Sequence, residues 1–171
     1  MNTVVRKMPT LVFPVRRVSV VSSRPFDEVV GSLSATIGHP DMVSFRSAIA
    51  AAPTLADLEK IVGAAIGPSG LMEFARYDSG EVIRKERGGQ GPRMIRFVVG
   101  NPLIMKEMAK LVPDAASYAP VTILVDERRD GVHLSYDSMA SAIAPYGNPP
   151  AYAVARDLDA KIEDLLESAA Y

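Results

Sequence analysis

Residues 121–136, with the sequence VTILVDERRDGVHLSY, contain two β-strand patterns separated by a turn signal. The pair Asp130-Gly131 tolerates the backbone angles that a tight hairpin turn requires. Side chains alternate between the two faces of a strand, and a loop of even length keeps the two apolar sets opposite each other. One face of the hairpin therefore collects Val121, Ile123, Val125, Glu127, Val132, Leu134 and Tyr136. We predict that this face is the core side. The opposite, wetter face then carries Thr122, Asp126, His133 and Ser135.

A long amphipathic helix at the carboxyl end is the expected cover for that face. Asn148-Pro149-Pro150 is typical of a helix start, because asparagine caps a helix and proline is tolerated in its first turn. An apolar stripe follows at three- and four-residue spacing: Ala151, Ala155, Leu158, Ile162, Leu165 and Ala169. The polar side carries Arg156, Asp157, Asp159, Lys161, Glu163, Asp164 and Glu167. We predict a helix of about five turns across the hairpin face that carries Val125, Leu134 and Tyr136.

The residues before the hairpin predict a strand, a helix and an inserted pair of helices. A β-branched strand over 15–22 leads into a helix whose apolar stripe ends at Gly38. The inserted helices lie near 44–66, and Ser44 and Thr54 are their expected N-caps.

After the inserted pair, the periodicity changes to that of strands. Three strands are expected, over 71–77, 81–86 and 93–99. Asn101-Pro102 then begins a further helix. This order predicts an α+β fold with two layers, β-α-β4-α, in which a curved antiparallel sheet packs against the long C-terminal helix. We expect residues 15–171 to form a single domain and residues 1–14 to form an N-terminal arm.

Composition excludes several classes of function. The chain has 171 residues, 48% of them hydrophobic, and a formal net charge of −1, so it lacks the overall basic charge that collects nucleic acid. It contains no cysteine, which rules out thiolate chemistry and disulfides, and its two histidines make a classical metal site a poor candidate. No apolar run approaches the roughly 18 residues that cross a bilayer, and no export signal is recognisable. We therefore expect a cytoplasmic protein without metal, cofactor, nucleic-acid or membrane partners.

Four segments follow one another in a distinctive order and spacing. They are 26–28 (FDE), 97–102 (FVVGNP), 119–127 (APVTILVDE) and 130–136 (DGVHLSY). Together they resemble the bacterial family of domains of unknown function numbered 302, well over 94–168, fairly over 15–37 and poorly over 38–92. The resemblance implies a fold of the TATA-binding-protein class, and it brings no established activity, substrate or catalytic residue.

The residues favoured for ligand binding lie at the rims of the predicted core face. Glu127 and Tyr136 are polar groups on an otherwise apolar face, and a buried polar group needs a partner. That partner is either a ligand or water in a cleft between the sheet and the C-terminal helix, or a group of the protein such as Arg96 or the backbone. Asn101 begins a helix, where it either only caps the helix or also contacts an anionic ligand. The candidate ligand-binding set is Arg96, Asn101, Tyr118, Glu127 and Tyr136.

Three functional hypotheses fit these patterns. The first is a domain without established catalysis that binds a small, partly apolar ligand between its sheet and its C-terminal helix. The second is a homodimeric interaction module, assembled through a sheet edge or through the 1–14 arm and the helices near 44–66. The third and weakest is an acid–base enzyme that uses His133 or Glu127, because His133 is equally an ordinary polar residue of a solvated sheet face. No residue is assigned as catalytic or as a metal ligand.

Overall fold

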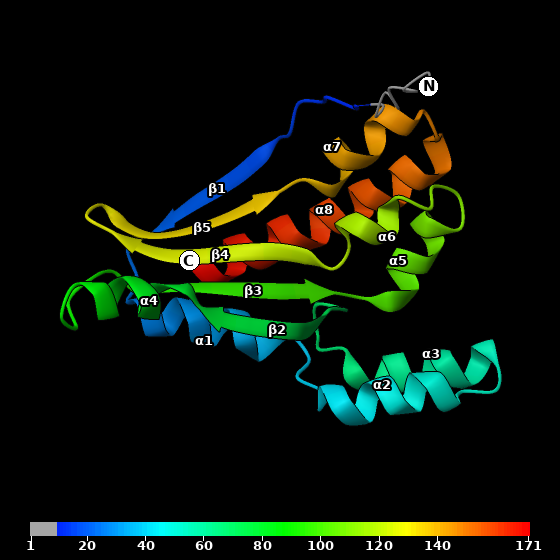
Figure 1. The fold of residues 1–171 in the computed structure, drawn as a ribbon, viewed down its shortest axis with the longest axis horizontal. Helices are drawn as coiled ribbons and strands as arrows, with labels where there is room; N and C mark the ends of the chain where they lie inside the picture. The colour runs from blue at the N-terminus through cyan, green and yellow to red at the C-terminus, as the bar shows by residue number, and fades with distance from the viewer. Residues whose placement is uncertain (1–9) are drawn as a thin grey trace, which may run out of the picture.

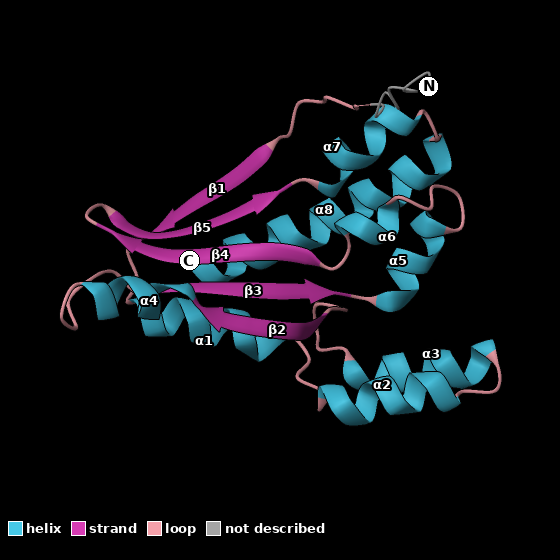
Figure 2. Ribbon diagram, viewed as in Figure 1, coloured by secondary structure: helices cyan, strands magenta, loops and turns pink. Residues whose placement is uncertain are grey.

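A five-stranded antiparallel sheet is the centre of the computed structural model, which describes residues 10–171 (Figure 2). The strand order is β1-β5-β4-β3-β2, with β1 and β2 at the edges. The strands are β1 (Arg17–Ser22), β2 (Met72–Asp78), β3 (Met94–Gly100), β4 (Val121–Arg128) and β5 (Gly131–Asp137). The α+β fold class predicted from the sequence is thus confirmed.

The hairpin β4–β5 has the predicted register. Ile123 lies opposite Tyr136, and Val125 lies opposite Leu134. All four side chains are at most 1% exposed, as expected for the core side of the sheet. The predicted face of the hairpin is therefore the buried one.

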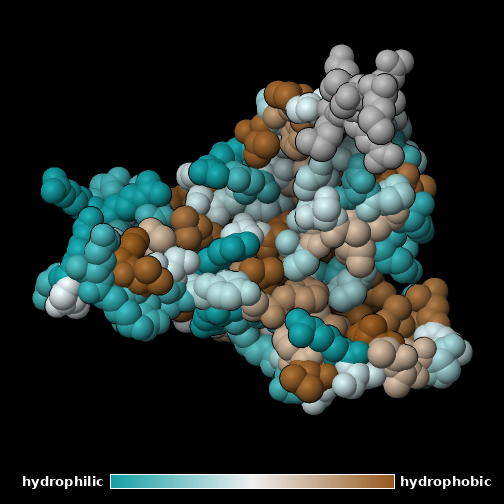
Figure 3. Space-filling view, viewed as in Figure 1, coloured by the Kyte–Doolittle hydropathy of each residue, from teal (hydrophilic) through white to brown (hydrophobic). Residues whose placement is uncertain are grey.

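Two helices cover this face. In Figure 1, α1 (Phe26–Thr36) and α8 (Pro149–Ala170) lie behind the sheet. The predicted stripe of α8 is buried throughout, and so are Phe26, Val29 and Leu33 of α1. Among the described residues, the helices at the right-hand end of the sheet are α5 (Pro102–Ala109), α6 (Ala115–Tyr118) and α7 (Met139–Ile143), followed by a 3₁₀ turn (Ala144–Tyr146). Within residues 10–171, the central part of the opposite sheet face carries no helix (Figure 1), and polar and apolar residues are interspersed on this side of the molecule (Figure 3).

The inserted helical pair is present as α2 (Met42–Ala51) and α3 (Leu55–Ala65). It has a small core of its own around Phe45, Val62 and Met72. Thr54 caps α3 as predicted, but the prediction for Ser44 is wrong, because Asp41 caps α2 and its carboxylate accepts a hydrogen bond from the Ser44 backbone N–H at 2.8 Å.

A close backbone approach fixes the base of this pair. The N–H groups of Gly38 and Gly67 both donate to the carbonyl of Leu71, each at 2.9 Å. A Cβ atom on Gly38 would lie 1.9 Å from the carbonyl oxygen of Ala65, so no larger residue fits without moving backbone. The glycine therefore allows the helical pair to join the edge of the sheet.

The predicted strand over 81–86 is wrong, because these residues belong to helix α4 (Ser79–Glu86). Asp78 caps this helix by accepting from the backbone N–H of Glu81 at 2.9 Å. The guanidinium of Arg84 donates a hydrogen bond to the Asp78 carboxylate and holds the pKa of Asp78 below the usual value. An ion pair between Glu81 and Lys85 adds local support on the helix surface.

Within residues 10–171, no helix combines the length and the apolarity that crossing a bilayer requires. Residues 1–9 of the expected arm lie outside the described part of the chain. Phe13, near the end of that arm, packs edge-on against Tyr118.

Candidate functional site

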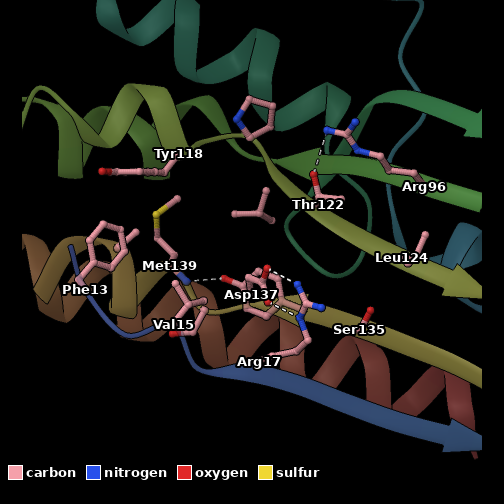
Figure 4. A pocket seen from close by; sticks show the side chains of 15 residues that line it. Phe13, Val15, Arg17, Arg96, Tyr118, Thr122, Leu124, Ser135, Asp137 and Met139 are labelled. Atoms are coloured by element: carbon pink, nitrogen blue, oxygen red, sulfur yellow. Dashed lines mark hydrogen bonds and ion pairs between the residues drawn. The ribbon is translucent and has the colours of Figure 1, made fainter. Parts of the chain in front are cut away.

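A hollow of about 540 Å³ opens on the face of the sheet that is not covered by α1 and α8. It lies where β4 and β5 meet α6 and α7 (Figure 4). Its lining consists of Phe13, Val15, Arg17, Arg96, Tyr118, Pro120, Val121, Thr122, Leu124, Ser135, Tyr136, Asp137, Ser138, Met139 and Ala142. The volume is within the range of pockets that take small organic molecules.

Strand alternation supplies the floor of the hollow. Arg96, Leu124 and Ser135 come from three neighbouring strands, and their pairing partners place them in one row across the open face. Thr122 lies on the same face of β4, and its hydroxyl accepts a long hydrogen bond of 3.4 Å from Arg96. The hairpin that buries Tyr136 on one side therefore presents polar groups to the hollow on the other.

Aromatic and aliphatic groups form the other end of the hollow. The rings of Phe13 and Tyr118 meet edge to face, with centroids 6.5 Å apart. Figure 4 shows the thioether of Met139 between them and Val15 beside Phe13. The Tyr118 hydroxyl lies 3.0 Å from that of Tyr146, and this hydrogen bond contributes most to raising the pKa of Tyr146. This end of the hollow is suited to an apolar group.

The two arginines of the hollow differ in their partners. Arg17 donates two hydrogen bonds to the carboxylate of Asp137, at 2.6 and 2.7 Å, and thereby lowers the pKa of Asp137. Arg96 has no carboxylate within 4.0 Å among residues 10–171. Its guanidinium lies 5.8 Å from the centre of the Tyr77 ring, which is not part of the lining. One positive charge of the hollow is therefore neutralised and the other is not.

Comparisons with known proteins identify the family. The family model described as "Domain of unknown function DUF302" matches residues 49–169. This chain belongs to the DUF302 family. No curated protein matches it. A solved structure, the uncharacterized conserved protein DUF302 from Bacillus stearothermophilus, is 12% identical with a TM-score of 0.61, covering 90% of this chain and 97% of that one. At this identity the likeness shows a shared fold.

The match also covers 49–92, where the sequence resemblance is poorest, whereas β1 and α1 precede it. The inserted helix α3 of this DUF302 domain thus lies within the family match, as does α4.

Tyr136 finds its hydrogen-bond partner inside the protein. Its hydroxyl donates to Asp159 of α8 at 2.6 Å, and burial followed by this hydrogen bond raises the pKa of Tyr136 well above its usual value. The Asp159 carboxylate also accepts hydrogen bonds from Ser138 Oγ and from the backbone N–H groups of Met139 and Ala140. The prediction that Asp159 lies on the polar side of α8 is wrong, because this residue is 4% exposed and joins α8 to the start of α7.

Two further candidate residues of the DUF302 domain are outside the hollow. Glu127 receives hydrogen bonds from the guanidinium of Arg93, which lower the pKa of Glu127. Asn101 caps α5 by accepting from the Leu103 backbone N–H at 2.8 Å, while its amide donates to the carbonyl of Gly70 at 2.9 Å. The structure therefore brings Arg96 and Tyr118 to the hollow, places Tyr136 at the border between the hollow and the core, and separates Glu127 and Asn101 from the hollow.

His133 lies on the open face but not in the hollow. Its ring is 2.9 Å from Asp130 in the hairpin turn, and this hydrogen bond is the main cause of a lowered pKa at Asp130. The neighbouring Asp126 is bound by Arg128 instead. This arrangement ties the hairpin together and offers no concave site for acid–base chemistry. Among residues 10–171, no cluster of three or more His, Asp or Glu side chains is arranged to hold a metal ion.

A second hollow, of about 620 Å³, lies between α7, α8 and the residues that precede β1. Its charged groups are Arg16, Arg156, Asp159 and Glu163. Arg16 pairs with Glu163 at 2.5 Å, and Asp159 already accepts several hydrogen bonds from the protein. Phe13 and Ser138 border both hollows of the DUF302 domain.

Proposed function

We propose that this DUF302 domain binds a small, partly apolar ligand in the hollow on the open face of its sheet. The observation that carries the proposal is the composition of the lining, in which aromatic and aliphatic groups at one end meet polar groups from β3 and β4 at the other. Binding sites for small molecules commonly combine an apolar wall with a few polar groups that fix orientation. The hollow is part of the fold, so binding there needs no rearrangement of the core.

The space between the sheet and α8, which the sequence pattern favours, is a less suitable site. Tyr136, Leu134 and Ile162 occupy it with at most 1% exposure, and Asp159 supplies the partner that Tyr136 requires. A ligand there would have to displace packed side chains, which costs free energy that a preformed hollow does not require. The proposal therefore places the ligand on the other side of the hairpin.

A binding role without catalysis fits the position of the ionisable groups. His133 and Glu127 are engaged with Asp130 and Arg93, and neither lines the hollow. The cytoplasmic location expected from the sequence stays a prediction. The likeness to the TATA-binding-protein class also stays a prediction, and it supports no part of the proposal.

Calorimetric titration with 1-octanol, a neutral amphipathic probe, tests this function. Ala142 lines the hollow, and A142W would fill part of it. Ala160 is an exposed residue of α8 that lines the second hollow, so A160W is the matched control. We expect saturable binding by the wild type and by A160W, and at least about tenfold weaker binding by A142W. No saturable binding by the wild type, or equal binding by A142W, would overturn the proposal.

A homodimer is the second candidate, and the observation that favours it is the exposed edge strand β1. Val21 on this strand is 42% exposed and Val15 just before it is 51% exposed. Exposed apolar edges of a sheet commonly pair with a second chain. Light scattering at two protein concentrations tests this, with V21K as the variant. A concentration-dependent dimer that V21K abolishes supports it, and a monomer at both concentrations excludes it.

A further inference from the structure

The charges around the open-face hollow are unbalanced. Its lining contains the two cations Arg17 and Arg96 and the single carboxylate of Asp137, which gives a formal charge of +1. The whole chain has a formal charge of −1, so the positive balance belongs to this place and not to the surface in general. An anion would therefore find a local electrostatic attraction here.

The excess charge can be assigned to one side chain. Asp137 accepts two short hydrogen bonds from Arg17, so the charges of these two residues neutralise each other. Within residues 10–171, Arg96 keeps only the long contact to Thr122 Oγ1 and the ring of Tyr77. A planar guanidinium presents paired N–H donors that match the two oxygens of a carboxylate. Arg96 is thus the group of the hollow that is free to bind an oxyanion.

The remaining walls restrict the part of a ligand that extends beyond its anionic group. Figure 4 shows Leu124 on the floor beside Arg96, and Phe13, Val15, Met139 and Tyr118 at the opposite end, beyond Thr122. A thioether and aromatic edges pack well against alkyl chains and rings. A small hydrophilic anion such as inorganic phosphate would leave this end of the hollow unused.

The second hollow does not show this combination. Its two arginines are balanced by Asp159 and Glu163, and Arg16 is already paired with Glu163. Of these two hollows, the open-face hollow is therefore the one whose lining has a net positive formal charge.

We infer that the ligand of this hollow is an amphipathic monocarboxylate, with its carboxylate on Arg96 and its apolar part between Tyr118, Phe13 and Met139. The inference rests on the proposed function, because it names the chemical class of ligand for the same site. It also assigns a role to Arg96 that a purely structural arginine on an open sheet face would not have.

Three probes of equal chain length separate charge from apolar binding: octanoate, 1-octanol and octylamine. Each is titrated into the wild type by calorimetry, and into R96Q, R96K and the control R129Q. Arg129 is an exposed arginine at the hairpin turn, outside the hollow. Circular dichroism and the urea midpoint of each variant establish that it is folded.

We expect octanoate to bind the wild type about five- to tenfold more tightly than 1-octanol, as one partly solvated charged hydrogen-bonding pair allows. Octylamine should bind most weakly. R96Q should remove the preference for octanoate and leave the affinity for 1-octanol unchanged, R96K should retain part of it, and R129Q should retain all of it. Raising the salt concentration should reduce the preference in the wild type.

The outcomes distinguish this inference from the proposed function. If octanoate and 1-octanol bind the wild type equally, or if R96Q keeps the full preference, the carboxylate assignment is overturned and the binding function stands. If none of the three probes binds saturably, both are overturned.

Discussion

The buried contact between Tyr136 and Asp159 makes a quantitative prediction about stability. The Tyr136 hydroxyl is 2.6 Å from the carboxylate of Asp159, which lies 23 residues later in the sequence, and this contact joins strand β5 to helix α8. Tyr136→Phe removes this hydroxyl without changing the ring that packs in the core. It also removes an acceptor for the backbone N–H of Met139, but that group still donates to Asp159 at 2.8 Å. The variant therefore leaves no backbone N–H group without a hydrogen-bond acceptor at this site.

The expected loss follows from the type of hydrogen bond. A hydrogen bond to a charged group contributes about 1.5–3 kcal/mol net. Because Asp159 keeps its bonds from Ser138, Met139 and Ala140, we expect Y136F to lower the free energy of unfolding by about 1.5–2 kcal/mol. D159N replaces one carboxylate oxygen, which accepts these hydrogen bonds, by an NH₂ group, which cannot accept them. It should lower the free energy of unfolding by about 3 kcal/mol. In the double variant the two losses should overlap by about 1 kcal/mol, since the residues are in direct contact.

Urea unfolding followed by circular dichroism measures these differences. Y152F is the matched control, because Tyr152 is 38% exposed and its hydroxyl has no hydrogen-bond partner among residues 10–171. It should change the free energy of unfolding by less than about 0.5 kcal/mol. If Y136F were as stable as Y152F, or if Y136F and D159N were fully additive, the proposed link between β5 and α8 would be refuted.

Three other predictions address different parts of the fold. The raised pKa of Tyr136 means that the folded state holds its proton more firmly than the unfolded state, so this contribution to stability is complete below about pH 10 and decreases as the pH rises above it; the urea midpoint should fall less between pH 9 and pH 11 in Y136F than in the wild type. Asn101→Ala should cost about 1–2 kcal/mol by urea unfolding, whereas N101D, which keeps the capping acceptor and loses the amide donor, should cost less, and equal losses would contradict the capping role. Gly38→Ala should lower stability by at least about 2 kcal/mol because the added Cβ meets the carbonyl of Ala65. G31A in helix α1, where a Cβ meets nothing within 4 Å, should raise the thermal midpoint instead.

The hairpin and the terminal helix could be predicted from sequence because each depends on a local period. Alternation in β4 and β5 fixed which face is buried, and the Asp130-Gly131 turn fixed the register. The stripe of α8 fixed the face that packs on the sheet. The same stripe contained a signal for Asp159, since it lies four residues after Ala155 and three before Ile162 and therefore on the buried side. Classing it by its polarity alone gives the wrong environment.

Helix α4 escapes prediction for a different reason. Val82 and Ile83 are β-branched, and their short run between a turn and a glycine-rich loop favours a strand by composition. The competing signal is the spacing of Asp78 and Glu81, which is that of an N-terminal cap. The cap and the ion pairs on the helix surface outweigh the weak preference of Val82 and Ile83 for a strand.

The hollow itself could not be predicted from local patterns. Its lining comes from β1 and the residues before it, from β3, from the end of α6, from both strands of the hairpin and from α7. The sequence pattern points to Arg96 and Tyr118, but for a cleft on the other side of the sheet. Which side is open depends on how α1 and α8 pack together, and no single segment specifies that.

The most direct test of a binding site on the open face uses the methionine methyl groups as reporters of where a ligand enters. Both methionines are nearly buried, with Met139 2% and Met108 0% exposed, but Met139 lines the open-face hollow and Met108 does not. Methyl NMR spectra are recorded while octanoate is added, with M139L and M108L to assign the signals. We predict that the Met139 methyl signal shifts saturably and that the Met108 signal stays in place. A shift of Met108 without a shift of Met139, or no shift of either signal, would contradict a binding site on the open face of the sheet.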